Sequence, residues 1–141
     1  MTEDVVPGST SVSTLIGAPL AGVAPDANLQ EVADAMVAAG VGALIVTNSN
    51  RDGAAGIVSE RDIVRALARR RDPATTLAGD IANTTLVWCD AEATVTDVAE
   101  RMVECYIRHV LVERDGRLVG IVSARDLLGD YVSGSMGIDE E

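Results

Sequence analysis

The feature that most constrains this chain is an internal duplication. When the sequence is aligned with itself at an offset of 66 residues, the segment that begins at Val23 matches the one that begins at Cys89. After a turn that is two residues shorter in the second copy, the offset becomes 64, and Gly-Ile-Val-Ser-x-Arg-Asp stands at both 56–62 and 120–126. Chance does not plausibly produce this agreement, so the chain holds two copies of one unit.

Both copies carry the same secondary-structure signals. In each, apolar residues at i, i+3, i+4, i+7 and i+8 predict a helix with one buried stripe. The two stripes are Leu29, Val32, Ala33, Met36 and Val37, and Val95, Val98, Ala99, Met102 and Val103. Two aliphatic runs around a turn rich in Asn, Asp and Gly then predict a pair of strands, at 42–47 and 55–58 and at 109–113 and 118–122. A second helix is expected to begin at about Arg61 in the first copy and at about Arg125 in the second.

These elements predict an α+β fold of two tandem β-α-β-β-α repeats. Residues 13–72 form the first repeat and residues 73–132 the second, and we expect residues 1–12 and 133–141 to be flexible ends. A single repeat would bury too little apolar surface to be stable, so the two should pack together with pseudo-two-fold symmetry. Equivalent residues would then surround a shared cleft.

Charge and hydropathy exclude several classes of partner. The chain has 22 acidic and 11 basic residues, a formal charge of −11, and would repel nucleic acid and anionic membranes. Residues 1–12 do not resemble a secretion signal, and no apolar run approaches the ~20 residues that span a bilayer. We therefore expect a cytoplasmic protein without nucleic-acid or membrane partners.

Metal binding and catalysis find little support. Cys89 and Cys105 are too few for a disulfide framework, and Cys105 with His109, the only histidine, falls short of the four ligands of a structural zinc site. Neither Cys105 nor His109 has an evident partner for catalysis, so we predict no enzyme, no metal and no required cofactor. The cluster Arg65, Arg69, Arg70 and Arg71 is interpreted as a solvated helix end.

The most suggestive motif is Gly-x-x-Ser-x-x-Asp, which stands in both copies where a strand leads into a helix. In one interpretation the Ser and the Asp only cap the helix. In the other, the free amides of the helix attract a phosphate, Ser and Arg donate hydrogen bonds to it, and Asp accepts from a pair of sugar hydroxyls. The residues leave both interpretations open.

The repeat and this motif resemble the CBS (cystathionine-β-synthase) domain pair over about residues 13–132. In that family an adenine nucleotide binds in the cleft between the repeats. The resemblance implies that the Asp residues hold the ribose, that the Ser residues approach phosphate, and that the neighbouring Arg residues assist. It also implies base contacts from the strand that follows the first helix. The implied ligands are Ser59, Arg61, Asp62, Ala43 and Ile45 in the first copy and Ser123, Arg125, Asp126, His109 and Leu111 in the second.

The resemblance therefore predicts a regulatory module that senses an adenosine-containing nucleotide such as AMP, ADP or ATP. It also implies a homodimer and an effector protein that the sequence does not identify. Because Gly42-Ala43 in copy one corresponds to Arg108-His109 in copy two, we predict unequal affinities, with Arg108 among the ligands of the more basic site. The alternative is a ligand-free interaction module in which the Ser-x-x-Asp elements act only as helix caps.

Overall fold

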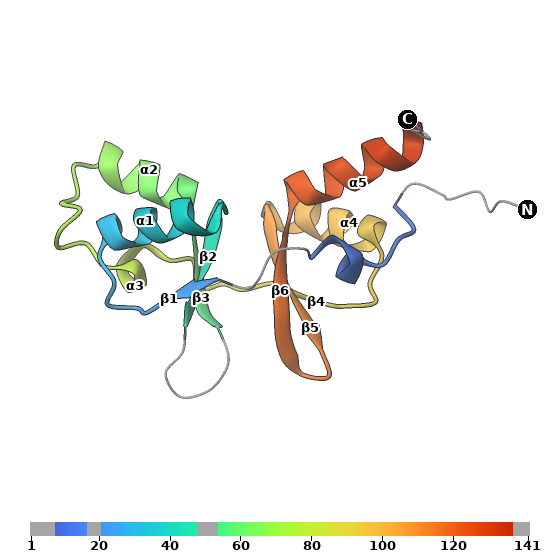
Figure 1. Ribbon diagram of the computed structural model, residues 1–141, viewed down its shortest axis with the longest axis horizontal. Helices are drawn as coiled ribbons and strands as arrows, with labels where there is room; N and C mark the ends of the chain where they lie inside the picture. Colours follow the sequence, from blue (N-terminus) through green and yellow to red (C-terminus); the bar gives the residue numbers. More distant parts are fainter. Residues whose placement is uncertain (1–7, 17–20, 48–53, 137–141) are drawn as a thin grey trace, which may run out of the picture. The chain divides into compact units, whose positions relative to one another are not determined.

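The computed structural model describes residues 8–16, 21–47 and 54–136, and these residues form two compact units (Figure 1). One unit consists of residues 21–86. The other combines residues 87–136 with residues 8–16. Both mix helices with a small sheet, so the predicted α+β class is confirmed. No helix in the described part of the chain is long and apolar enough to cross a membrane.

The unit of residues 21–86 is a three-stranded sheet with two helices packed on one face (Figure 1). Strand β1 (Gly22–Val23) is parallel to β2 (Ala43–Thr47), and β2 is antiparallel to β3 (Ala54–Ser59). Helix α1 (Leu29–Ala39) connects β1 to β2, and α2 (Glu60–Ala68) follows β3 without a break; a short helix, α3 (Ala78–Ile81), completes the unit.

The second unit repeats this arrangement. Strand β4 (Trp88–Asp90) is parallel to β5 (His109–Arg114), which is antiparallel to β6 (Arg117–Ser123). Helix α4 (Val95–Cys105) connects β4 to β5, α5 (Ala124–Met136) follows β6, and a 3-10 turn, η1 (Val12–Leu15), takes the place of α3. The repeat predicted from the sequence is therefore confirmed element by element.

The first helix of each repeat has matching signals at its two ends. Asn28 and Glu31 form a capping box at the start of α1, and Thr94 and Asp97 form one at the start of α4. At the other end, α1 closes on Gly40, in the left-handed conformation at φ 69°. The equivalent residue at the end of α4 is Tyr106, at φ 55°. A residue with a Cβ is strained in this conformation, so the end of α4 is less stable than the end of α1.

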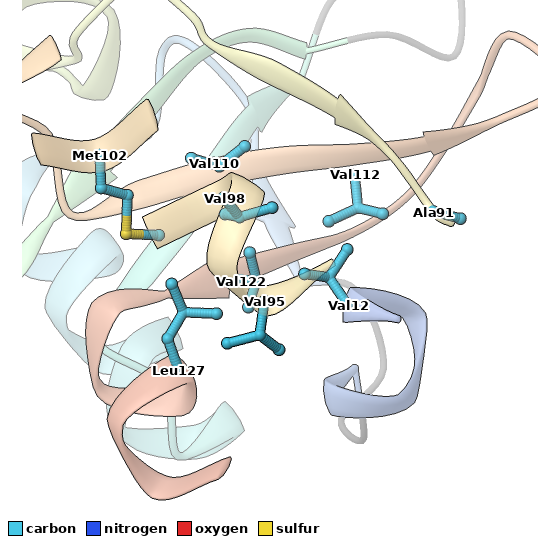
Figure 2. Packing of buried hydrophobic residues seen from close by; sticks show 9 residues of the cluster. All are labelled: Val12, Ala91, Val95, Val98, Met102, Val110, Val112, Val122 and Leu127. Carbon is cyan, nitrogen blue, oxygen red and sulfur yellow. The ribbon is translucent and has the colours of Figure 1, made fainter. Parts of the chain in front are cut away.

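Each unit has its own apolar core between the sheet and the helices. In the second unit, shown in Figure 2, side chains from α4, β5, β6 and α5 converge with Val12 from the distant N-terminal segment. The first unit has the matching core around Val32, Met36, Leu44 and Val58. The side chains of both cores are at most 5% exposed, so the helix stripes and the aliphatic strands form the cores.

The last residue of each predicted stripe, however, is not buried. Val37 is 82% exposed and its counterpart Val103 is 75% exposed. Around the helix axis, the residue at position i+8 lies about 80° from the residue at position i, which places it outside a buried stripe this narrow. The prediction of burial was wrong at these two positions, and both copies show the same departure.

The short helices are exchanged between the repeats. By the 66-residue offset, η1 belongs to the first repeat, but it packs in the unit of the second, and α3 does the reverse. The contacts match: Val12 N donates to Ala93 O at 2.8 Å, and the equivalent Ala78 N donates to Ala27 O at 2.8 Å. Each unit is thus completed by a segment that the other repeat supplies.

This exchange changes the boundaries expected from the sequence. Residues 8–12, expected to be flexible, are packed into the second unit, where Val12 is fully buried. Residues 73–86, assigned by the sequence to the second repeat, lie in the unit of the first. At the other end, α5 continues through residues 133–136, and the rest of the predicted tail, residues 137–141, lies outside the described residues.

The motif glycines allow the exchanged segments to approach. A Cβ on Gly56 would lie 3.0 Å from Asn83 O and 3.1 Å from the Cβ of Ala82. A Cβ on Gly120 would lie 2.6 Å from Ile16, the equivalent of Ala82. The structure therefore gives these glycines a packing role that does not involve a ligand.

Candidate functional site

The Ser-x-x-Asp element of the first copy forms a tight corner between β3 and α2. Ser59 is the N-cap of α2 and its backbone N–H donates to Asp62 Oδ2 at 2.8 Å. The Ser59 hydroxyl also donates to Asp62 Oδ2, at 3.0 Å, and accepts from the Asp62 backbone N–H at 3.4 Å. Both side chains are partly buried, so the pair forms a closed capping box at a strand-to-helix junction.

The second copy reproduces the corner between β6 and α5. Ser123 N donates to Asp126 Oδ2 at 2.9 Å, and Asp126 N donates to Ser123 Oγ at 3.0 Å. Asp126 is exposed where Asp62 is only partly so. The helix cap is therefore formed in both copies, and any ligand would have to bind to groups that already serve the cap.

The predicted base-contacting residues Ala43 and His109 lie at the start of the strand beside each corner. Ala43 pairs with Ser59, and His109 pairs with Ser123, in the antiparallel ladders. The first amide of each helix is also held there, since Glu60 N donates to Gly42 O at 3.0 Å and Ala124 N donates to Arg108 O at 2.9 Å. Each repeat thus unites its Ser, Asp and strand-start residues in one corner, called corner one and corner two below.

The remaining predicted base contacts lie deeper in the strands. Ile45 is 2% exposed and Leu111 is fully buried. Their backbone N–H groups donate to Ala21 O at 3.1 Å and to Val87 O at 2.9 Å, in the segments that lead into each repeat. The structure therefore places Ile45 and Leu111 in the sheets, where they support the strand starts at Ala43 and His109.

The arginines at the corners are exposed to solvent. Arg61 and Arg125 are the second residues of α2 and α5, and both are exposed, as is Arg108. A guanidinium on the first turn of a helix sits against the positive end of the helix dipole, an arrangement that capping does not require. Two such arginines at equivalent corners are suited to hold an anion that approaches the helix start.

Corner one carries a carboxylate that the sequence analysis did not consider. Glu60, the first residue of α2, lies over Gly42: a Cβ on that glycine would meet Glu60 Oε1 at 2.9 Å. The equivalent residue in corner two is Ala124. Corner one therefore has Glu60, Arg61 and Asp62, and corner two has Arg108, Arg125 and Asp126, a difference of two charges. The 64-residue offset alone would have revealed this contrast.

The two cysteines are in different surroundings. Cys89 is partly buried on β4, and this burial, together with the carboxylates of Asp90 and Glu113, raises the pKa of its thiol to about 11 in spite of Arg101. Its thiolate is therefore scarce at neutral pH, which makes it a poor nucleophile or metal ligand. Cys105 is exposed and ends α4, so it does not share a helix with His109. Within the described ranges, no three His, Cys, Asp or Glu side chains group as a metal site.

Proteins of known structure share this fold. A protein from Pyrobaculum aerophilum, solved in complex with AMP, is 30% identical, with a TM-score of 0.75 over 87% of this chain and 98% of its own. Hypoxic response protein I, solved with two coordinated zinc ions, is 31% identical, with a TM-score of 0.69 over 85% and 98%. Hypoxic response protein 1 of Mycobacterium tuberculosis is 36% identical over 88 residues, 62% of this chain.

The chain spans only part of the length of these curated relatives. The matched region spans 61% of the Mycobacterium tuberculosis protein and 54% of a relative from Methanopyrus kandleri. The CBS domain family matches residues 1–69 and 78–133, which covers both repeats with their corners. The chain therefore belongs to the CBS domain family, as a tandem pair of CBS domains.

Proposed function

We propose that this CBS pair is a regulatory module that binds an adenosine-containing nucleotide at its two corners. The observation that carries the proposal is the doubled corner: the same Ser, Arg and Asp meet the start of the neighbouring strand in both repeats. Capping explains the Ser and the Asp, and packing explains the Gly, but neither explains an exposed Arg on the first turn of both helices. AMP in the Pyrobaculum aerophilum neighbour supports the choice of ligand.

The chemistry of each corner suits the parts of a nucleotide. Asp62 and Asp126 are acceptors that a pair of ribose hydroxyls can satisfy. The Ser hydroxyls and the guanidinium groups of Arg61 and Arg125 are donors for phosphate, and the positive end of the helix dipole favours its charge. The adenine would lie against the strand starts at Ala43 and His109. Nucleotide binding would need no cofactor and no bond-breaking step.

The charges of the corners predict which ligand each prefers. Glu60 repels the additional phosphates of ADP and ATP at corner one, and Arg108 attracts them at corner two. We expect AMP to be tolerated at both corners and ATP to favour corner two. Titration calorimetry should resolve two unequal sites for ATP, and Glu60→Ala, which copies Ala124, should tighten ATP binding at corner one about two- to fivefold. Two identical ATP sites would contradict this assignment.

The second candidate is an interaction module that binds no nucleotide. It is favoured by the closed capping boxes, which already use the Ser hydroxyl and the Asp carboxylate. It is also favoured by the packing role of Gly56 and Gly120. In this case the exposed arginines would be surface residues without a ligand.

Thermal unfolding with and without AMP or ATP separates the two candidates. A ligand at 100 times its dissociation constant adds about 2.7 kcal/mol to the free energy of unfolding. Asp62→Ala and Asp126→Ala should each remove one site, and the double variant should lose the whole shift. Asp97→Ala is the matched control, because it breaks the same kind of capping box on α4 away from the corners. No shift in the parent protein at millimolar nucleotide would favour the interaction module.

We further infer that the protein acts as a homodimer, as its resemblance to the family implies, and that the dimer transmits the bound state to an effector protein. The support is an exposed apolar outer surface on both helix pairs, which includes Val64 at 64% and Leu128 at 63%. Native mass spectrometry of the purified protein measures the oligomer and any retained nucleotide together. A monomer at micromolar concentration would contradict the dimer without touching the nucleotide proposal.

A further inference from the structure

Four exposed arginines lie at the end of α2, in a chain that has only 11 basic residues and a formal charge of −11. We call them the arginine cluster: Arg65, Arg69, Arg70 and Arg71. At the 64-residue offset the second repeat has glycine or serine in all four places: Gly129, Ser133, Gly134 and Ser135. Helix α5 forms without these arginines, so the fold of a repeat does not require them.

The turn that ends α2 holds Arg70 in a conformation that favours glycine. Arg71 N donates to Ala66 O at 3.0 Å, and Arg70 N donates to Leu67 O at 2.9 Å. In helix ends of this kind the left-handed residue is usually glycine, but here it is Arg70, at φ 63°. A residue with a Cβ is strained in this conformation, and such strain is concentrated at positions that serve a function. The helix end would be more stable with glycine, so stability does not explain the arginine.

The positive charge of the arginine cluster is not neutralised by nearby carboxylates. In the part of the chain that the structure describes, the one ion pair joins Arg114 to Glu92 at 3.6 Å. The four guanidinium groups of the cluster are therefore not paired with a carboxylate of any described residue. Asp72 follows the cluster directly, but its Oδ1 accepts from the Ala74 backbone N–H at 2.9 Å. Although the chain has 22 acidic residues, the cluster presents its charge to solvent.

The helix dipole accounts for only part of the cluster. A cation is favoured on the last turn of a helix, which explains Arg65 on α2 and Arg69 at its C-cap. The effect fades beyond the last turn and does not explain Arg70 and Arg71. The cluster is also separate from corner one, because α2 begins at that corner and the cluster is at its other end, roughly 13 Å away along the helix axis. A partner at the cluster would not displace a nucleotide from the corner.

We propose that the arginine cluster docks a short acidic segment of a partner protein, in which several Asp or Glu side chains lie close together. Guanidinium groups bind carboxylates through paired hydrogen bonds, so adjacent arginines recognise adjacent carboxylates. A long polyanion such as nucleic acid fits less well, because beyond the cluster it meets a chain with a net charge of −11. A short segment stays within the ~8 Å over which charges act at physiological salt and avoids that repulsion. This inference goes beyond nucleotide binding and does not depend on it.

Binding of a labelled hexaglutamate peptide, measured by fluorescence anisotropy, tests the proposal. We expect a dissociation constant below about 1 mM at low salt that rises as salt is added. Each exposed ion pair contributes a factor of about 1.5 to 5, so a triple variant of the cluster should bind about tenfold more weakly. This variant is Arg65→Gln, Arg69→Gln and Arg71→Gln. The matched control removes three exposed arginines elsewhere and should bind within about twofold of the parent: Arg101→Gln, Arg114→Gln and Arg117→Gln.

Arg70→Gly separates binding from stability. It relieves the left-handed strain, so the urea midpoint of unfolding should not fall. It also removes one charge from the cluster, so the affinity for hexaglutamate should fall about two- to fivefold. A lower urea midpoint with unchanged peptide affinity would show that Arg70 is structural and would contradict the proposal.

The remaining outcomes are also decisive. Equal peptide affinities of the two triple variants, or a parent protein that does not bind hexaglutamate below about 1 mM at low salt, would overturn the acidic partner. A single-stranded hexanucleotide that binds the cluster more tightly than the peptide would overturn it in favour of nucleic acid. Thermal unfolding of each variant verifies that it folds. The cluster variant should keep any thermal shift caused by AMP, so failure of the nucleotide proposal is seen separately.

Discussion

The left-handed residue at the end of α4 makes Tyr106→Gly a stabilising change. An L-residue pays roughly 1–2 kcal/mol in this conformation, and Tyr106 adopts it at φ 55°. The side chain is 95% exposed, so its removal loses almost no burial. About 0.5–1 kcal/mol of this gain is offset, because glycine loses more conformational entropy than other residues when the chain folds. The expected net gain is about 0.5–1 kcal/mol in the free energy of unfolding.

The first repeat supplies the reverse experiment in the same protein. Gly40 occupies the equivalent position at φ 69°, and a Cβ there would meet nothing within 4 Å. Gly40→Ala should therefore lose about 0.5–1 kcal/mol through the backbone alone. Urea unfolding followed by circular dichroism measures both changes, and the slope of each transition should stay constant while the midpoint moves by about 0.3–0.5 M. A destabilised Tyr106→Gly with an unchanged slope would refute the argument from backbone conformation.

Two further predictions concern the core and the cysteines. Gly56→Ala should cost about 1–3 kcal/mol, because the new Cβ meets Asn83 O at 3.0 Å, whereas Gly129→Ala in α5 meets nothing and should be neutral or stabilising; equal urea midpoints would contradict this. Cys89 should be alkylated at least tenfold more slowly at pH 8 than an unperturbed thiol, since its pKa is raised to about 11. The pKa of the Cys89 thiol is higher in the folded chain than in the unfolded chain. The protonated thiol therefore contributes to the stability of the fold below about pH 9, and this contribution is lost as the pH rises from about 9 to about 11. Rapid loss of both thiols to iodoacetamide in the folded protein would contradict the assignment.

The sequence predicted the parts of the fold that depend on local pattern. The bounds of β2, β3, β5 and β6 and the starts of the helices followed from the duplicated pattern. The capping pairs followed from a motif whose Ser and Asp are three residues apart, so their proximity needs no tertiary information. Each predicted stripe of five apolar positions included one residue that is exposed, because periodicity alone does not give the width of the buried face. Which ligand the corners bind does not follow from the capping geometry, because a cap and a phosphate site use the same groups.

The exchanged short helices could not be predicted in the same way. Helix α3 has four residues and η1 has four, too few for a periodic signal, and each contacts residues far along the chain or across the linker between repeats. The glycines that admit these segments, Gly56 and Gly120, are also the first residues of the predicted binding motif, and a glycine lets a backbone approach a ligand as closely as it lets another segment approach. A packing requirement and a binding requirement select the same residue type here, and the contacts of Gly56 and Gly120 show the packing requirement.

The exchange of the short helices is the arrangement expected if the chain arose by fusion of two one-repeat chains. Two copies of a one-repeat chain that swap their N-terminal segments, when joined end to end, give the arrangement seen around Val12 and Ala78. In separate chains the swap would dissociate on dilution. Within one chain the short connections keep each segment at a high effective concentration beside its acceptor unit. Gene fusion would thus have turned a concentration-dependent assembly into a permanent one.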